Sequence, residues 1–188
     1  MSNTKTPANA ETTANLAAAP PPQSPETLET LQALQTLLDR TLIHDLFTRY
    51  YTSLDGGDPE GFGKYFVDGA ELDVNGIVVH GQQEIADLYR RVAADKPPRT
   101  GTFRMILSNP LIEVTGTIAT AQFLWTQLLN DAIKGPPQLI EQGREFDRLV
   151  KRDGQWRITQ RVVIADSGLP NLFDQTYTPR KDYELPAQ

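Results

Sequence analysis

The sequence predicts an α+β fold in which helices pack across one face of a curved antiparallel sheet. Three observations indicate this class: helical periodicity in the first third of the chain, an Asn-Gly turn signal at positions 75 and 76, and four long strand-like segments after residue 100. Helices followed by a run of strands are typical of α+β proteins. A sheet that curves around its helices encloses an apolar pocket, where such folds commonly bind a ligand.

Length, charge and cysteine content narrow the class of protein. The chain has 188 residues, a net charge of −6 and no Cys. The length fits one domain with a tail, and the missing thiols exclude disulfides and cysteine catalysis. The acidic balance argues against a nucleic-acid partner, and no apolar run approaches the roughly 18 residues of a membrane span. No apolar segment typical of an export signal precedes the Ala-rich stretch, so we expect a cytoplasmic protein.

Composition divides the chain into three parts. Residues 1–27 are rich in Ala, Thr and Pro and contain one Leu and no aromatic residue, so they predict a disordered arm. Residues 28–166 carry the periodic patterns of a folded domain. Residues 167–188 are polar and contain Pro, and we expect their scattered Leu and Tyr side chains to pack on the domain.

The first element is an amphipathic helix that ends at Asp55-Gly56-Gly57. Its apolar positions recur at steps of three and four residues: Leu28, Leu31, Leu34, Leu38, Leu42, Leu46 and Tyr50. Asp58-Pro59 predicts the start of a short helix, with Asp as the N-cap. A further helix is predicted over 82–95, where Pro97-Pro98 follows it.

The strands are bounded by turn residues. Segments 70–74 and 77–79 flank Asn75-Gly76 and predict a hairpin. The remaining predicted strands cover 101–114, 118–130, 138–151 and 155–166.

Several of these segments carry a family resemblance. They are Ile43–Asp58, Phe66–Ala70, the Gly76, Gly81 and Ile85 spacing, Ser108-Asn109-Pro110, and Gly154–Arg161. Together they resemble the SnoaL-like branch of the NTF2-like superfamily, over about residues 37–163. The resemblance implies a cone-shaped α+β barrel. It leaves the activity open, because this fold hosts dehydratases, isomerases, cyclases, other lyases and binding proteins.

Tyr50 and Asp55 lie at the spacing at which dehydratase-like members have a Tyr and an Asp facing the cavity. The resemblance therefore implies Tyr50 or Tyr51 as a hydrogen-bond donor or acid and Asp55 as a base. An apolar pocket would raise the pKa of the carboxyl group, which suits it to proton abstraction. The alternative is that Tyr50 packs in the core and Asp55 caps the Gly-Gly turn.

The position at which the family often has a general-base His is Met105 here, so proton transfer has to come from another group. The two histidines, His44 and His80, are expected to be structural or exposed. Arg104 is a candidate anion holder, and it points to the opposite face of its strand from Met105. If Arg104 instead faces outward, it would lie in a subunit interface.

The predicted strand 118–130 places alternate residues on one face as a wall for an aromatic ligand, or simply as core: Ala119, Ala121, Phe123, Trp125, Gln127 and Leu129. Glu145 and Asp147 also share a face. A buried carboxylate pair would supply acid and base, whereas the alternative is ion pairing with a nearby Arg such as Arg161. The predicted substrate-binding residues are Met105, Asn109, Phe123, Trp125, Gln127, Glu145 and Arg161.

These features favour a lyase that works without a cofactor or metal, since the chain has no nucleotide-binding motif and only two well-separated His. The resemblance implies a hydrophobic aromatic or polycyclic alcohol as substrate, with lignin-derived diaryl compounds as one class. The products would include water or a small carbonyl such as formaldehyde. An isomerase or polyketide-type cyclase, and a non-catalytic binding or assembly subunit, stay open. A homo-oligomer is expected, as a dimer or a trimer.

Overall fold

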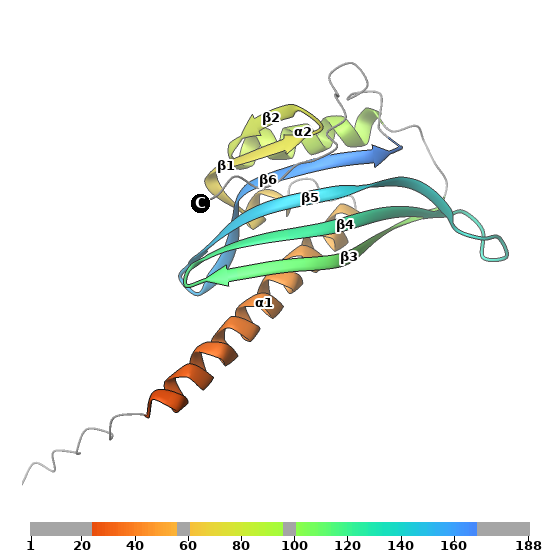
Figure 1. Cartoon of the computed structure of the whole chain (residues 1–188). Coiled ribbons are helices and arrows are strands. Elements are labelled where there is room, and N and C mark those ends of the chain that lie inside the picture. Colours follow the sequence, from red (N-terminus) through yellow and green to blue (C-terminus); the bar gives the residue numbers. More distant parts are fainter. Residues whose placement is uncertain (1–23, 56–60, 96–100, 169–188) are drawn as a thin grey trace, which may run out of the picture.

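The computed structural model describes residues 24–55, 61–95 and 101–168 (Figure 1). The helices are α1 (Pro25–Asp55), the 3-10 turn η2 (Gly63–Tyr65) and α2 (Gly81–Asp95). The strands are β1 (Phe66–Val74), β2 (Ile77–His80), β3 (Thr102–Thr115), β4 (Ile118–Asn130), β5 (Gln138–Arg152) and β6 (Gln155–Ser167). The α+β class is therefore confirmed. Nearly all of the expected N-terminal arm and C-terminal tail, and the predicted helix start at Asp58-Pro59, lie outside the described residues.

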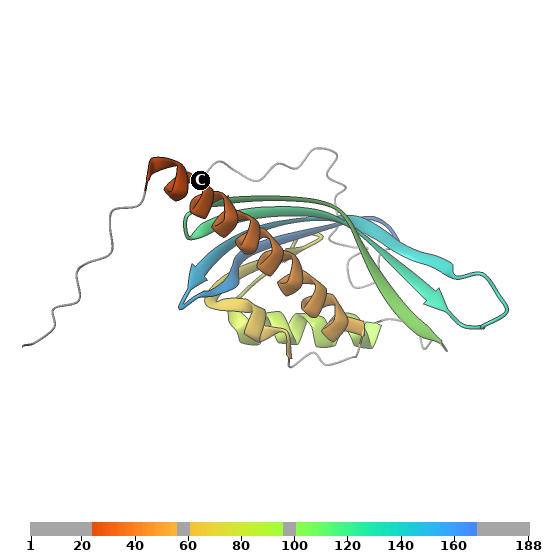
Figure 2. The same ribbon diagram turned by 90° about the horizontal axis from the view of Figure 1, so that it is seen from below.

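The strands of these ranges form one open six-stranded sheet in the order β2-β1-β6-β5-β4-β3. Neighbouring strands are antiparallel except β1 and β6, which are parallel. The sheet is therefore mixed and not purely antiparallel as predicted. The parallel pair arises because the chain leaves β1 through β2, α2 and the β3–β5 meander before β6 returns beside β1. Helix α1 crosses the curved sheet diagonally, and α2 packs near β1 (Figure 2).

The predicted hairpin turn is confirmed. Asn75 and Gly76 both have positive φ, 53° and 89°, as a tight two-residue hairpin requires. Asp73 Oδ1 accepts the Gly76 backbone N–H at 2.8 Å, and Asn75 Oδ1 accepts the Ala165 N–H at 2.7 Å. The turn thus fixes the end of β1 and joins it to β6.

Helix α1 begins at Pro25, three residues before the predicted start. The Ser24 side chain accepts the Thr27 N–H at 3.2 Å, and Pro25 fills the first helical position, where its missing N–H costs nothing. The N-terminal half of α1 extends beyond the sheet (Figure 1). Its leucines are 39% to 60% exposed: Leu28, Leu31, Leu34, Leu37, Leu38 and Leu42. Of the predicted apolar face, only Leu46 and Tyr50 are therefore buried.

Asp39 fastens the middle of α1 to the turn between β5 and β6. Its Oδ1 accepts hydrogen bonds from Lys151 Nζ at 2.6 Å and Trp156 Nε1 at 2.9 Å, and its Oδ2 accepts one from Gln35. Burial alone would raise the pKa of Asp39, but these donors outweigh it and hold the pKa below its usual value. This contact fixes which face of the following helical turns meets the sheet.

No helix in the described ranges combines the length and the apolar character that a membrane crossing needs.

Candidate active site

A bulge in β6 turns Arg161 toward α1. The register pairs Gln160 with Arg148 and Ile158 with Leu149, so Thr159 is an extra residue without a partner on β5. Such a bulge shifts the alternation of side chains by one position. Ile158 and Arg161, three residues apart, are consequently both completely buried.

Two carboxyl groups of β5 meet Arg161. Asp147 lies opposite Arg161 in the register, and Glu145 follows on the same face. Arg161 Nε donates to Asp147 Oδ1 at 2.8 Å, and Arg161 Nη2 lies 3.0 Å from Glu145 Oε1. All three side chains are 0% exposed. We call Glu145, Asp147 and Arg161 the charged cluster.

Aromatic side chains of α1 cover the charged cluster. The guanidinium carbon of Arg161 lies 4.1 Å from the ring centroid of Tyr50, 5.0 Å from that of Phe47 and 5.5 Å from that of Tyr51. Cation–π attraction of this kind strengthens when water is excluded. The Tyr51 hydroxyl donates a hydrogen bond to Glu145 Oε2. Helix α1 therefore contributes both an apolar cover and one hydroxyl donor.

A pair of tyrosines lies beside the charged cluster. The Tyr50 hydroxyl is hydrogen-bonded to the Tyr89 hydroxyl, which comes from α2. Phe62 stacks on the Tyr89 ring with a centroid distance of 4.7 Å. The two helices and the sheet thus meet at one aromatic and charged centre.

Burial dominates the protonation of this centre. It raises the pKa of Asp147 to about 8, although the Arg161 charge acts in the opposite direction. Burial likewise raises the pKa of Glu145, again against Arg161, and it raises that of Tyr51, where the Glu145 charge adds to the effect. Burial would lower the pKa of Arg161, but the two carboxyl groups keep it above its usual range.

Arg161 therefore stays charged at neutral pH, and Asp147, with a pKa of about 8, is mostly protonated there. The Tyr51 hydroxyl and Arg161 both favour the charged form of Glu145, against the effect of its burial, which raises the pKa. The centre then holds one base, one acid and a phenol in an apolar surrounding.

Some buried polar atoms of the charged cluster have no hydrogen-bond partner among the described residues. Asp147 Oδ2 and Arg161 Nη1 are buried and form no hydrogen bond within the part of the chain that the structure describes, whereas Arg161 Nη2 pairs with Glu145 Oε1. A buried polar atom without a partner costs about 1–3 kcal/mol. Unpaired buried atoms are uncommon and call for an explanation, one of which is a catalytic role.

Five of the predicted site residues meet here. Tyr50, Tyr51, Glu145 and Arg161 belong to the centre just described, and Phe123 lies opposite Glu145 in the register. The Phe123 ring packs on Phe47 with a centroid distance of 4.8 Å.

Two predicted residues, Arg104 and Asn109, lie away from this centre at exposed positions of β3. Arg104 is exposed and donates to its neighbour's carbonyl, that of Phe103. Side chains alternate along β3, and Met105 is the one that packs against the core. Asn109 is exposed in a β3 bulge, where its φ is 51°. Asp55 is the last residue of α1, and its side chain lies outside the described part of the chain.

The same face of β4 continues past the charged cluster to Trp125 and Gln127, which are both buried. Trp125 lies opposite Gly143, and a Cβ on Gly143 would come within 2.4 Å of the indole ring. Only glycine leaves room for this ring. Trp125 Nε1 is buried and donates to no group in the described ranges. Met105 is half-buried and lies opposite Gln127 on β3.

Sequence reasoning left Phe47, Tyr89 and Asp147 out of the site. Asp147 carried a signal, since it shares a strand face with Glu145 and was weighed as a partner of Arg161. Phe47 and Tyr89 occupy apolar helix faces, and nothing in their spacing distinguishes them from ordinary core residues. His44 and His80 are exposed. Among the described side chains, His, Asp and Glu form no group of three or more that could hold a metal ion.

Comparison with known proteins places this geometry in a family. The SnoaL-like domain matches residues 35–162, and a search of curated proteins finds no match. A Mycobacterium tuberculosis protein of unknown function, Rv3472, is similar at 26% identity with a TM-score of 0.59, over 69% of this chain and 77% of that one.

Two structures from Novosphingobium aromaticivorans share the fold. An NTF2-like protein with a cystatin-like fold has 23% identity and a TM-score of 0.59, over 78% of this chain and 92% of that one. A candidate scytalone dehydratase has 20% identity and a TM-score of 0.60, over 79% and 97%. At these identities the likeness concerns the fold alone. Because the family match spans more than half of the sequence, this chain belongs to the SnoaL-like family within the NTF2-like superfamily.

Proposed function

We propose that this protein is a cofactor-independent lyase acting on a hydrophobic aromatic alcohol, from which it eliminates water or formaldehyde. The observation that carries this proposal is the buried centre in which the Tyr51 hydroxyl donates to Glu145 beside Arg161 and Asp147. An acid and a base in hydrogen-bond contact inside an apolar site are what proton-transfer catalysis needs.

In the dehydration, the Glu145 carboxylate takes a proton from the carbon next to the one that carries the hydroxyl. The C–O bond breaks as the departing oxygen receives the Tyr51 phenolic proton, so that a C=C bond and water form. Glu145 then returns its proton to Tyr51 through the hydrogen bond that already joins them. Arg161 stays charged throughout and limits the charge that builds up in the site.

Loss of formaldehyde uses the same groups. Glu145 takes the proton of the terminal alcohol, the C–C bond breaks to release formaldehyde, and the carbon that keeps the electron pair receives the Tyr51 proton. The return step is unchanged. Neither route needs an oxidant or a reductant.

We propose that the substrate ring lies along β4 against Trp125, with Gln127 and Met105 beyond it. Support comes from the shared face of these residues with Phe123 and from the unused Trp125 N–H, which would donate to a substrate oxygen. A large apolar wall with few polar groups suits an aromatic ligand.

The test is turnover of a panel of aromatic alcohols, including diaryl ones, followed by product mass. Tyr51→Phe and Glu145→Gln should each reduce turnover by about a hundredfold, the usual contribution of a positioned acid or base. Arg91→Gln, an exposed substitution on α2, is the matched control and should leave turnover unchanged. A loss of less than tenfold in both active-site variants would remove these assignments.

A non-catalytic binding or assembly subunit is the second candidate, and one observation favours it. The charged cluster is 0% exposed, as a purely structural ion-pair network would be. Ligand binding without any change in product mass across the panel would support this reading. A new product of unchanged mass would instead indicate an isomerase or a cyclase.

We also propose a homo-oligomer, dimer or trimer. The exposed leucines of α1, named above, form an apolar surface on the part of the helix that leaves the sheet (Figure 1). Large exposed apolar patches commonly mark interaction surfaces. Light scattering should give a multiple of the chain mass, and Leu31→Gln with Leu38→Gln should reduce it. A single-chain mass for the native protein would contradict the proposal.

A further inference from the structure

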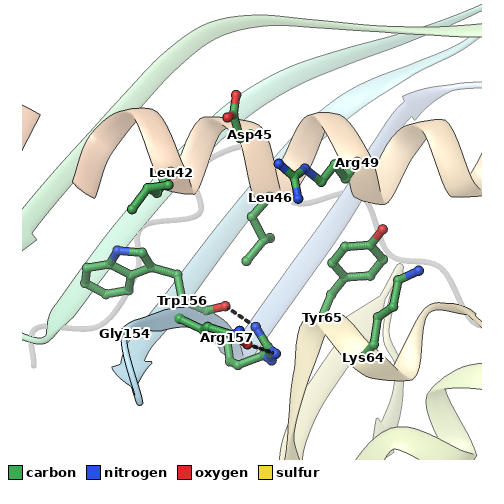
Figure 3. A pocket seen from close by; sticks show the side chains of 10 residues that line it. Leu42, Asp45, Leu46, Arg49, Lys64, Tyr65, Gly154, Trp156 and Arg157 are labelled. Atoms are coloured by element: carbon green, nitrogen blue, oxygen red, sulfur yellow. Dashed lines mark hydrogen bonds between the residues drawn. The ribbon is translucent and has the colours of Figure 1, made fainter. Parts of the chain in front are cut away.

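A pocket separate from the charged cluster opens on a neighbouring face of α1 (Figure 3). Its volume is about 440 Å³, within the range of small-molecule sites. One wall is an α1 stripe at helical spacing: Leu42, Asp45, Leu46 and Arg49. The other walls come from η2 and from the turn into β6: Lys64, Tyr65, Gly154, Gln155, Trp156 and Arg157.

Three cations from three different elements surround this pocket. Arg49, Lys64 and Arg157 line it, and Asp45 is the one acidic residue in its lining. Arg157 donates to the Trp156 carbonyl and to the Gln155 side-chain oxygen, both neutral, and no carboxylate of the described residues forms an ion pair with it. Within the described residues, Arg49 and Lys64 form no ion pair with a carboxylate. The pocket is thus locally positive on a chain whose net charge is −6.

The floor between these cations is apolar. Leu42 and Leu46 project from α1 toward the indole of Trp156 and the ring of Tyr65 (Figure 3). Asp45 points to the other side of the helix from Trp156 and Arg157 in the same view. Trp156 is held in place by its hydrogen bond to Asp39, so this wall is preformed. A fixed apolar floor with a cationic rim suits a flat, apolar anion.

We propose that this pocket binds an aromatic carboxylate, with its ring system against Trp156, Leu46 and Tyr65 and its carboxylate among Arg157, Lys64 and Arg49. The site is independent of the proposed catalytic centre. A ligand bound there would lie on a different face of α1 from Phe47 and Tyr50.

The probe is naphthoate, and naphthamide is its uncharged counterpart of nearly the same shape. Calorimetry with the full chain should detect naphthoate and give binding at least tenfold weaker for naphthamide. Lys64→Gln and Arg157→Gln should each weaken naphthoate binding by about fivefold, the upper end for a partly exposed ion pair, and the double variant by about 25-fold. Arg104→Gln removes one exposed charge on β3, outside this pocket, and should change nothing.

Amide shifts in NMR spectra locate the bound probe, and they should concentrate at Gly154, Gln155 and the middle of α1. Equal affinity for naphthoate and naphthamide would overturn the proposal. So would equal weakening by Arg104→Gln, or shifts that gather along β4 beside Trp125. Glu145→Gln should leave naphthoate binding intact, so failure of this site and failure of the proposed catalysis give different results.

Discussion

Arg157 and Arg161 lie four residues apart on β6, but they differ in burial and in the groups that contact their charge. Arg161 is fully buried against two carboxyl groups and three aromatic rings. Arg157 is half-buried at the rim of an open pocket, and its hydrogen bonds within the described residues go to neutral oxygens. Away from water a charge depends on its protein partners, whereas at a surface the solvent supplies what the partners do not. The first arrangement couples stability to protonation, and the second is free to accept a ligand.

The largest effect is expected from Arg161→Met, which leaves Glu145 and Asp147 buried without their cation. Removing one partner of a buried ion pair typically costs about 3–5 kcal/mol, and we expect a loss of unfolding free energy in this range at pH 7. Urea unfolding followed by circular dichroism measures it. Adding Glu145→Gln and Asp147→Asn should recover part of the loss, because no carboxylate is then left unpaired. A loss below about 1 kcal/mol for Arg161→Met would mean that water reaches the cluster.

The next effect concerns pH. Because the pKa of Asp147 in the folded protein is about 8, against an ordinary value of 3.8, the group is protonated when folded and ionised when unfolded between these values. Unfolding then releases a proton, so stability falls as pH rises from about 4 to 8 and levels off above that. The slope contributed by one such group is at most about 1.4 kcal/mol per pH unit.

Asp147→Asn tests this directly. Asn still offers Arg161 Nε an acceptor oxygen, but it has no proton to lose. Urea unfolding of native protein and variant across this pH interval should show a shallower decline for the variant. The pKa of Glu145 is also raised, and it accounts for the decline in stability that the variant still shows. Identical pH profiles for the two proteins would contradict a protonated Asp147.

A smaller effect is expected from Tyr51→Phe, which removes only the hydroxyl that donates to Glu145. The ring keeps its contact with Arg161, so the change isolates one hydrogen bond to a charged group. We expect a loss of about 1.5–3 kcal/mol in unfolding free energy. Tyr50→Phe, whose hydroxyl pairs with the neutral Tyr89, is the matched control and should cost about 1 kcal/mol. Equal losses would argue that Glu145 is uncharged in the folded protein.

The comparison also explains which features the sequence could predict. The strand boundaries and the Asn75-Gly76 turn follow from local patterns, and the structure agrees with them within a few residues. The burial of Arg161 does not, because strict alternation puts Arg157 and Arg161 on one face. The bulge at Thr159 separates them, and no turn or glycine signal marks it. Long-range register therefore decides which arginine enters the core.

The two halves of α1 also show what a local sequence pattern does not predict. Leucine spacing is regular along most of the helix, so periodicity alone predicts one continuous buried face. The N-terminal half of the helix extends beyond the sheet, so burial of its apolar side chains begins only at Ile43 (Figure 1). Helical pattern fixes which residues share a face, whereas the extent of the partner surface fixes how many of them lose contact with water.

The smallest effect is expected from Arg157→Met, and it completes the comparison with Arg161→Met. In the part of the chain that the structure describes, no carboxylate pairs with Arg157, and the residues that lose its hydrogen bonds line the pocket, where water can replace it. The change in unfolding free energy should therefore stay within about 0.5 kcal/mol. The same urea titration measures it, with the identical chemical replacement four residues away as the reference. A loss comparable to that of Arg161→Met would show that the pocket rim is part of the packed core and not a preformed site for an anion.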